Sequence, residues 1–212
     1  MLPRLHLVTD DAILRAPDFP ARARAVVEAH GPAVALHVRG HGLSARELHG
    51  LATSLVEAAA KTGTRLFVND RIDVALVVGA DGVQLGRRSL PVPAARAVIG
   101  DRRWIGVSVH SPEEAADAES DGADFVLAGT IYASASHPGE APAGAGRLRE
   151  MARSTTLPVL AIGGIVPERV TEVRRAGAFG VAVLGGAWKA KDPVRAIARY
   201  LEALAEEVAC RR

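Results

Sequence analysis

Two pairs of glycines in the last third of the chain point to a binding site for a phosphate group. Gly163-Gly164 and Gly185-Gly186 each follow a short apolar run. Glycine lets backbone N–H groups approach a ligand closely, and the loops after strands 7 and 8 hold phosphate in many (β/α)8 barrels. The alternative is that the glycines only allow tight turns between a strand and a helix. We predict that all four glycines bind the phosphate of a small molecule.

A second group of residues that could bind an anion lies early in the chain. His37, Arg39 and His41 alternate, so an extended backbone would place their side chains on one face. Arg offers a fixed fork for phosphate, and His changes its charge near neutral pH. The alternative is a solvated strand end at which Gly40 and Gly42 make a turn. We predict substrate binding and no metal site, because a zinc site needs a third ligand that the sequence does not indicate.

Further polar residues lie at the ends of other predicted strands, where a barrel would open onto its ligand. They are the remaining candidates for substrate binding: Asn69, Asp70, Gln84, Ser108 and Thr130. Asn69 or Asp70 would also serve as the cap of the helix that follows. A cap at this end of a barrel still directs an amide or a carboxylate toward the ligand.

The elements that would position these residues recur along the whole chain. Eight short apolar runs are typical of buried strands: 5–8, 34–38, 66–68, 82–85, 104–107, 125–128, 159–162 and 181–184. Segments with helical spacing lie between them, and Ser44 and Ser111 begin two capping boxes. No Gly-x-Gly-x-x-Gly follows the first strand, which disfavours an open nucleotide-binding sheet. The pattern predicts an α/β fold, a (β/α)8 TIM barrel forming one domain over residues 1–212.

Composition excludes several classes of function. Hydrophobic residues make up 49% of the 212 residues and aromatic residues only 4%, which suits parallel strands covered by helices. The net charge is only +2 and the sequence contains no long basic run, so we expect no nucleic acid partner. No apolar stretch approaches the length of a membrane span, so we expect a cytoplasmic protein without a membrane partner. The single cysteine, Cys210, excludes a disulfide within the chain.

The chain resembles the thiamine phosphate synthase/TenI superfamily of (β/α)8 barrels over nearly its whole length. The resemblance rests on an ordered set of segments, which are 7–10, the segment around Arg39, 68–71, 80–86, 106–110, 122–126 and 161–165. It implies a barrel that binds a phosphorylated thiazole in thiamin biosynthesis.

The synthase branch of that superfamily joins a pyrimidine methyl diphosphate to a thiazole phosphate and releases diphosphate with the help of Mg2+. Of its binding residues, Arg39, Asn69, Asp70 and Ser108 match here. The positions at which this chain departs from the pattern are His37 for Gln, His41 and His137 for Lys, Ser89 for a metal-binding Asp, and Ser134 and Ser136 for Thr. The resemblance therefore implies no cofactor here, and Mg2+ only if the chain is a synthase.

The TenI branch matches at His37, at Gln84 and over residues 109–115. Its known activity is a thiazole tautomerisation, in which a histidine just after strand 6 transfers a proton. Thr130 occupies that position here, and a threonine hydroxyl is no general base near neutral pH without a partner. His37 and His137 are then the candidates for the base.

On this resemblance we predict a TenI-like thiazole tautomerase, which is an isomerase. The alternatives are a thiamine phosphate synthase and a binder or regulator without catalytic activity. In each case the partner is a phosphorylated thiazole, and the sequence is compatible with a homo-oligomer.

Overall fold

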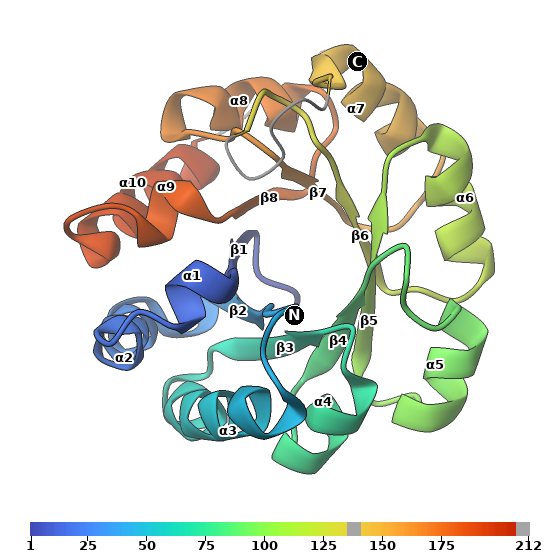
Figure 1. Cartoon of the computed structure of the whole chain (residues 1–212). Coiled ribbons are helices and arrows are strands. Elements are labelled where there is room, and N and C mark those ends of the chain that lie inside the picture. The colour runs from blue at the N-terminus through green and yellow to red at the C-terminus, as the bar shows by residue number, and fades with distance from the viewer. Residues whose placement is uncertain (135–140, 207–212) are drawn as a thin grey trace.

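Eight parallel strands close into a barrel in the computed structural model, which describes residues 1–134 and 141–206. The strands follow one another around the ring in chain order, and β1 pairs with β8 to close it (Figure 1). They are β1 (Leu5–Val8), β2 (Val34–Val38), β3 (Arg65–Asn69), β4 (Gly82–Leu85), β5 (Trp104–Val109), β6 (Phe125–Ala128), β7 (Val159–Ile162) and β8 (Gly180–Val183). The predicted α/β barrel is confirmed.

Helices connect the strands and form an outer ring around them (Figure 1). They are α1 (Asp11–Leu14), α2 (Phe19–His30), α3 (Ala45–Thr62), α4 (Ile72–Val78), α5 (Val92–Ile99), α6 (Pro112–Ser120), α7 (Gly144–Arg153), α8 (Pro167–Arg175), α9 (Gly185–Trp188) and α10 (Pro193–Ala205), with a short 3-10 turn at Gly31–Ala33. Ser44 forms the predicted capping box with Glu47, and the Ser111 side chain caps α6. The predicted helix starts at these two positions are confirmed.

Strand boundaries differ from the predicted ones at three places. Both ends of β3 extend by one residue, and β5 continues to Val109 because Ser108 and Val109 pair with β6. Toward the end of the chain, β8 begins one residue earlier than predicted, at Gly180. It stops at Val183 because the backbone of Leu184 turns out of the strand to begin α9. Leu184 therefore lies just beyond the carboxyl end of β8.

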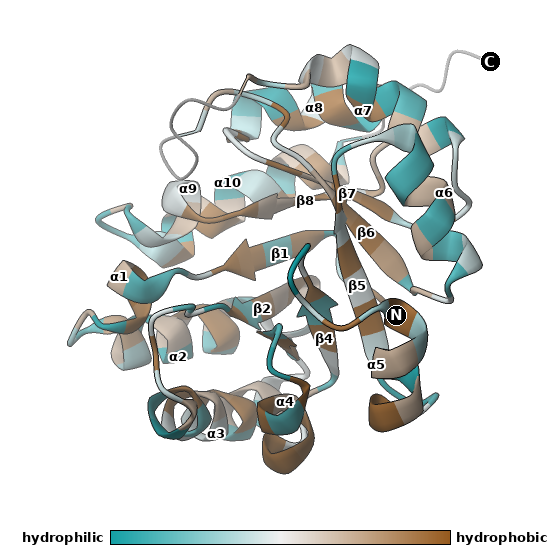
Figure 2. Ribbon diagram, turned by 45° about the vertical axis from the view of Figure 1, so that its right-hand side comes forward, coloured by the Kyte–Doolittle hydropathy of each residue, from teal (hydrophilic) through white to brown (hydrophobic). Residues whose placement is uncertain are grey.

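The hydrophobic core has two parts. The larger part lies between the strands and the helices, and the smaller part fills the inside of the barrel. Figure 2 shows the hydrophobic colour concentrated on the strands, with hydrophilic colour on the outer sides of many helix turns. Phe67 and Phe125 meet edge to face inside the barrel, with ring centroids 5.4 Å apart. Such aromatic side chains let a chain that is poor in aromatic residues fill its interior.

Two histidines, His6 and His37, are fully buried beside these rings. Nε2 of His6 lies 3.1 Å from the carbonyl oxygen of Pro3, which can only accept, so this nitrogen carries the proton. Nδ1 of the neutral His6 ring then accepts from Nε2 of His37, at 2.7 Å. The pair is thus a polar chain of fixed tautomers running up the barrel toward its carboxyl end.

Burial keeps both rings uncharged. Loss of hydration lowers the pKa of His37 from 6.5 to about 3, although the nearby Asn69 amide opposes the shift. The pKa of His6 also lies well below 6.5, first because of burial and then because His37 is close. A charged ring would lack the hydration that it has in the unfolded chain.

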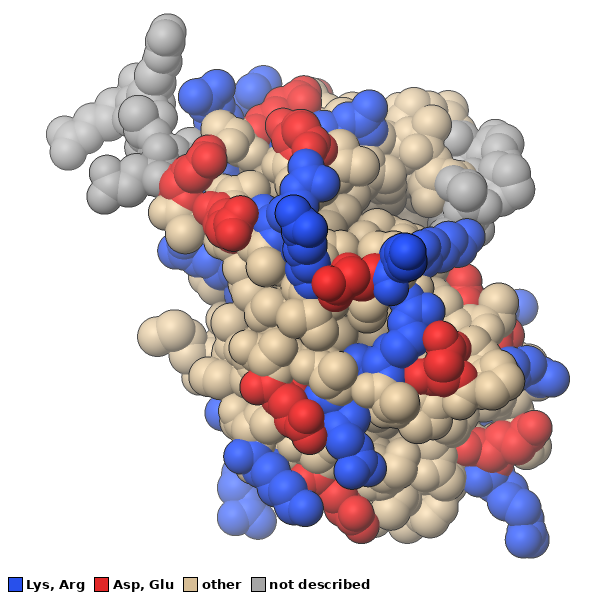
Figure 3. Space-filling model, turned by 90° about the vertical axis from the view of Figure 1, so that its left-hand side faces the viewer, with Lys and Arg blue, Asp and Glu red and all other residues tan. Residues whose placement is uncertain are grey.

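Charged side chains are mixed on the side of the barrel that carries α2, α9 and α10. Figure 3 shows Lys and Arg interspersed with Asp and Glu over the described part of this face. Across the described residues, no helix combines the length and apolar character that crossing a membrane requires.

Acid is expected to destabilise the fold through the His6 and His37 pair. Because both pKa values are lower in the folded protein, the unfolded chain binds more protons, and the free energy of unfolding falls as the pH drops below 6.5. Each histidine contributes up to ~1.4 kcal/mol per pH unit in this range. Urea unfolding at a series of pH values between about 8 and 5 measures the slope.

Two variants test whether the buried histidines cause this pH dependence of the free energy of unfolding. His37→Gln removes one of the two buried groups and should reduce the slope. His49→Gln changes an exposed histidine on α3 and should leave it as it is. Equal slopes in the wild type and in His37→Gln would contradict this origin of the pH dependence.

Candidate active site

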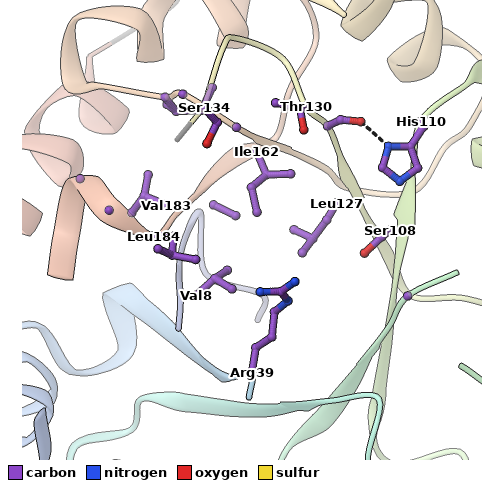
Figure 4. Close-up of a pocket in the computed structure, with 18 of the residues that line it drawn as sticks. Val8, Arg39, Ser108, His110, Leu127, Thr130, Ser134, Ile162, Val183 and Leu184 are labelled. Atoms are coloured by element: carbon purple, nitrogen blue, oxygen red, sulfur yellow. Dashed lines mark hydrogen bonds between the residues drawn. The ribbon is translucent and has the colours of Figure 1, made fainter. Parts of the chain in front are cut away.

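A cavity of about 1060 Å³ opens at the carboxyl ends of the strands. Its floor is apolar, and the side chains that form it come from β1, β6, β7 and the end of β8 (Figure 4). They are Val8, Leu127, Ile162, Ala182, Val183 and Leu184. Ligand pockets usually have volumes of about 300–1,000 Å³, so this cavity has room for two small substrates.

The rim after β7 and β8 is built from the predicted glycines, all four of which line the cavity. Gly163 has a φ of +101°, and a Cβ atom there would lie 2.5 Å from Cγ2 of Thr130. The N–H groups of Gly185 and Gly186 open α9 and meet no acceptor within the described residues. A phosphate at this rim would supply those acceptors.

Two cations border the same rim. The Lys189 side chain passes over Gly185, with its Cδ atom 3.5 Å from where a Cβ would be. Arg169 donates to the carbonyl oxygen of Gly164 at 3.0 Å, and its guanidinium lies 4.2 Å from the centroid of the Tyr132 ring. Arg169 therefore holds the glycine loop in place, and Lys189 adds positive charge above it.

Arg39 and His41 line the cavity after β2, three strands around the ring from β7. The Arg39 N–H donates to Oγ1 of Thr9 at 2.9 Å, and this buried hydroxyl donates to the carbonyl oxygen of His37 at 3.0 Å. Figure 4 shows the Arg39 side chain rising from the end of β2 into the cavity. The backbone at Arg39 is thus fixed while its guanidinium faces the ligand space.

Asp70, directly after β3, is tied to the loop after β4. Its Oδ1 atom accepts from the Gly86 N–H at 3.1 Å and from the Ser89 hydroxyl. Its Oδ2 atom lies 3.6 Å from Nδ1 of His41. The predicted cap of α4 by Asn69 or Asp70 is therefore wrong: Arg71 occupies the cap position without a side-chain bond, because the Asp70 carboxylate has better donors across the rim.

This donor set does not fit a magnesium ion held by the protein. Mg2+ needs near-octahedral oxygen ligands, and here one Asp70 oxygen is already occupied while Ser89 contributes only a hydroxyl. No cluster of three or more His, Cys, Asp or Glu side chains suitable for a metal occurs among the described residues. The other carboxylate oxygen of Asp70 lies beside His41.

The third part of the rim follows β5 and β6. Gln84 donates from Nε2 to the Ser108 hydroxyl oxygen at 3.1 Å, which leaves the Ser108 proton free for a ligand. Nδ1 of His110 lies 2.6 Å from the carbonyl oxygen of Gly129, as drawn in Figure 4. Because a carbonyl only accepts, Nδ1 carries a proton in this contact.

Most of the predicted site residues meet at this cavity. In addition to the four glycines, its lining includes Arg39, His41, Asn69, Asp70, Ser108 and Thr130. His37 and Gln84 do not line it, since their exposed fractions are 0% and 1%. Contrary to the predicted cluster, β2 ends at Val38, and His37 lies one layer deeper, against His6. His137 and Ser136 fall outside the described residues.

Four cationic residues at the cavity were not singled out from the sequence. They are Arg87, Arg88, Arg169 and Lys189. Arg87 and Arg88 follow β4 after one glycine. Their position directly after a predicted strand was the signal that could have indicated a place at the cavity. Lys189 and Arg169 lie on or next to helices, where charged residues usually face solvent.

Comparisons with known proteins place the chain in a family. The family model described as thiamine monophosphate synthase matches residues 5–187. The thiamine-phosphate synthase of Salinispora arenicola is 38% identical over 96% of this chain and 98% of its own length. That of Chloroflexus aurantiacus is 41% identical over 95% and 92%.

Solved structures of similar proteins agree with this family assignment. The thiamine phosphate pyrophosphorylase of Pyrococcus furiosus superposes with a TM-score of 0.82 at 32% identity and covers 95% of each chain. A 3-hexulose-6-phosphate synthase, at 19% identity and a TM-score of 0.71, shares the fold.

These relatives correct the predicted function. The prediction of a TenI-like tautomerase is wrong, because the similar curated proteins carry the name of the synthase. The coarser prediction, that the chain is an enzyme, is confirmed. From its match over residues 5–187 and from relatives that cover almost its whole length, the chain belongs to the thiamine monophosphate synthase family.

Proposed function

We propose that this protein is a thiamine phosphate synthase, which joins a pyrimidine methyl diphosphate to a thiazole phosphate and releases diphosphate. The observation that carries the proposal is a pair of rims at one cavity, each of which offers donors to an anion. Arg39 follows β2 and Gly163 follows β7, and these strands lie three places apart in a ring of eight. Two rims suit two phosphorylated substrates.

The thiazole phosphate belongs at the rim after β7 and β8. Its oxygens would accept from the N–H groups of Gly185 and Gly186, and Lys189 would add positive charge. The ring of the thiazole would lie over Ile162 and Leu184. The predicted role of the glycine pairs is part of this proposal.

The diphosphate belongs at the second rim, where Arg39 and His41 face the cavity. The attached pyrimidine would rest on Val8 and Leu127, with the Ser108 hydroxyl free to donate to a ring nitrogen. Asn69, the last residue of β3, also lines the cavity and would offer its side-chain amide to the substrate.

The chemistry that follows is a displacement at the methylene carbon of the pyrimidine. The thiazole nitrogen forms the new C–N bond, and the C–O bond to diphosphate breaks with both electrons leaving on oxygen. Negative charge therefore grows on the diphosphate, where the Arg39 guanidinium stabilises it. Because no proton is transferred, the reaction needs no base at Thr130.

The direct test is to incubate the purified protein with both substrates and Mg2+. We expect thiamine phosphate and diphosphate in equal amounts. Arg39→Gln should lower kcat by roughly 10²-fold or more, as expected for loss of a group that stabilises the leaving charge. Arg175→Gln, an exposed residue at the far end of α8, is the matched control and should leave the rate unchanged. Absence of condensation in the folded wild type would refute the proposal.

Gly185→Val tests the thiazole phosphate rim. A Cβ at residue 185 has room in the fold, since its nearest neighbour is the flexible Lys189 chain, but it would cover the N–H groups. We expect at least tenfold weaker binding of thiazole phosphate, about 1.4 kcal/mol, measured by calorimetry.

Gly50→Val on α3, where a Cβ meets nothing within 4 Å, controls for a general effect of the substitution. Gly163 is a poorer choice, because its φ of +101° and the nearby Thr130 would strain any side chain. Unchanged affinity in a folded Gly185→Val protein would place the phosphate elsewhere.

A further inference from the structure

Arg87 and Arg88 occupy the tip of a tight turn at the edge of the cavity. The Ser89 N–H donates to the carbonyl oxygen of Gly86 at 3.0 Å, so residues 86–89 form a β-turn with the two arginines in its central positions. Both arginines line the cavity. The turn fixes where their side chains begin.

Asp70 anchors this turn from the neighbouring strand. The Gly86 N–H donates to Oδ1 of Asp70 and lies 2.9 Å from Oγ of Ser89, and the Ser89 hydroxyl donates to the same Asp70 oxygen. Ser89 therefore acts as a structural link at the position where the synthase pattern has a metal-binding Asp. The link uses up one oxygen of the Asp70 carboxylate.

The charges around this turn are unbalanced in favour of cations. Some partly exposed arginines elsewhere pair with carboxylates, as Arg65 does with Asp81 at 2.6 Å and Arg96 with Asp124 at 2.7 Å. By contrast, Arg39, Arg87 and Arg88 have no carboxylate partner within the described residues. Three unpaired guanidinium groups beside one cavity leave positive charge available to an anion.

We propose that Arg87 and Arg88, together with Arg39, hold the diphosphate group directly, in place of a metal ion shared by two protein carboxylates. This inference rests on the proposed function, since the diphosphate comes from that reaction. Guanidinium groups bind phosphate oxygens through paired N–H donors and stay charged at every working pH. This chain has Ser89 where the synthase pattern has a carboxylate, and two arginines precede it directly.

The test measures binding of inorganic diphosphate by calorimetry in the presence of a chelator. We expect wild-type protein to bind without Mg2+, and the double variant Arg87→Gln with Arg88→Gln to bind at least tenfold more weakly, about 1.4 kcal/mol. Arg87→Lys with Arg88→Lys keeps the charge and should retain more affinity than the Gln pair.

The matched control removes the same charge from the opposite end of the barrel. Arg102→Gln with Arg175→Gln changes two exposed arginines that precede β5 and β8, and it should leave diphosphate affinity unchanged. A wild type that binds diphosphate only with Mg2+, or equal affinity in the wild type and the Arg87 and Arg88 Gln variant, would overturn the inference.

The condensation assay separates this inference from the proposed function. If the wild type condenses the two substrates but the Arg87 and Arg88 Gln variant keeps full diphosphate affinity, the inference fails and the function stands. If diphosphate binds through both arginines but no condensation occurs, the subsite stands and the proposed function fails.

Discussion

Closure of eight parallel strands is the constraint on which the rest of the molecule depends. Since β1 pairs with both β2 and β8, every strand ends at the same rim, and loops far apart in sequence share one cavity. The Arg39 loop and the Gly185 loop meet the same ligand space for that reason alone. The order of the strands then sets which loops face each other across the cavity, and so separates one anion rim from the other.

The sequence was sufficient to predict the barrel, because eight apolar runs and their helix caps repeat the same local rule. It was also sufficient to place Arg39, Asp70, Ser108 and Gly185 at the rim, since residues that end a strand share that position. Depth along the barrel was harder to predict. His37 and Arg39 have the spacing of one strand face, but His37 lies a layer below and is sealed among aromatic rings, because the strand ends between them.

That difference in depth also explains why the branch of the family was misjudged. His37 and Gln84 favoured the tautomerase, yet both are buried within the barrel, and His37 bonds to another core histidine. The third match to that branch was the segment 109–115, and within it Ser111 caps α6. These residues report on packing and helix initiation. Arg87 and Arg88 are the arginines that we propose bind the diphosphate. The sequence did not single them out, because a pair of arginines in a loop is typical of a solvated turn and only the structure places that turn against Asp70.

The absence of a histidine at Thr130 has a different meaning for the two reactions. A tautomerase moves a proton between two atoms of its substrate and needs a group that can accept it. A condensation that expels diphosphate moves electrons onto an anion instead, and its barrier falls where fixed positive charge meets that anion. The cavity has Thr130 where the base would be and three arginines without carboxylate partners, among the described residues, where the leaving group would be. Its charge distribution therefore favours the departure of an anion over the transfer of a proton.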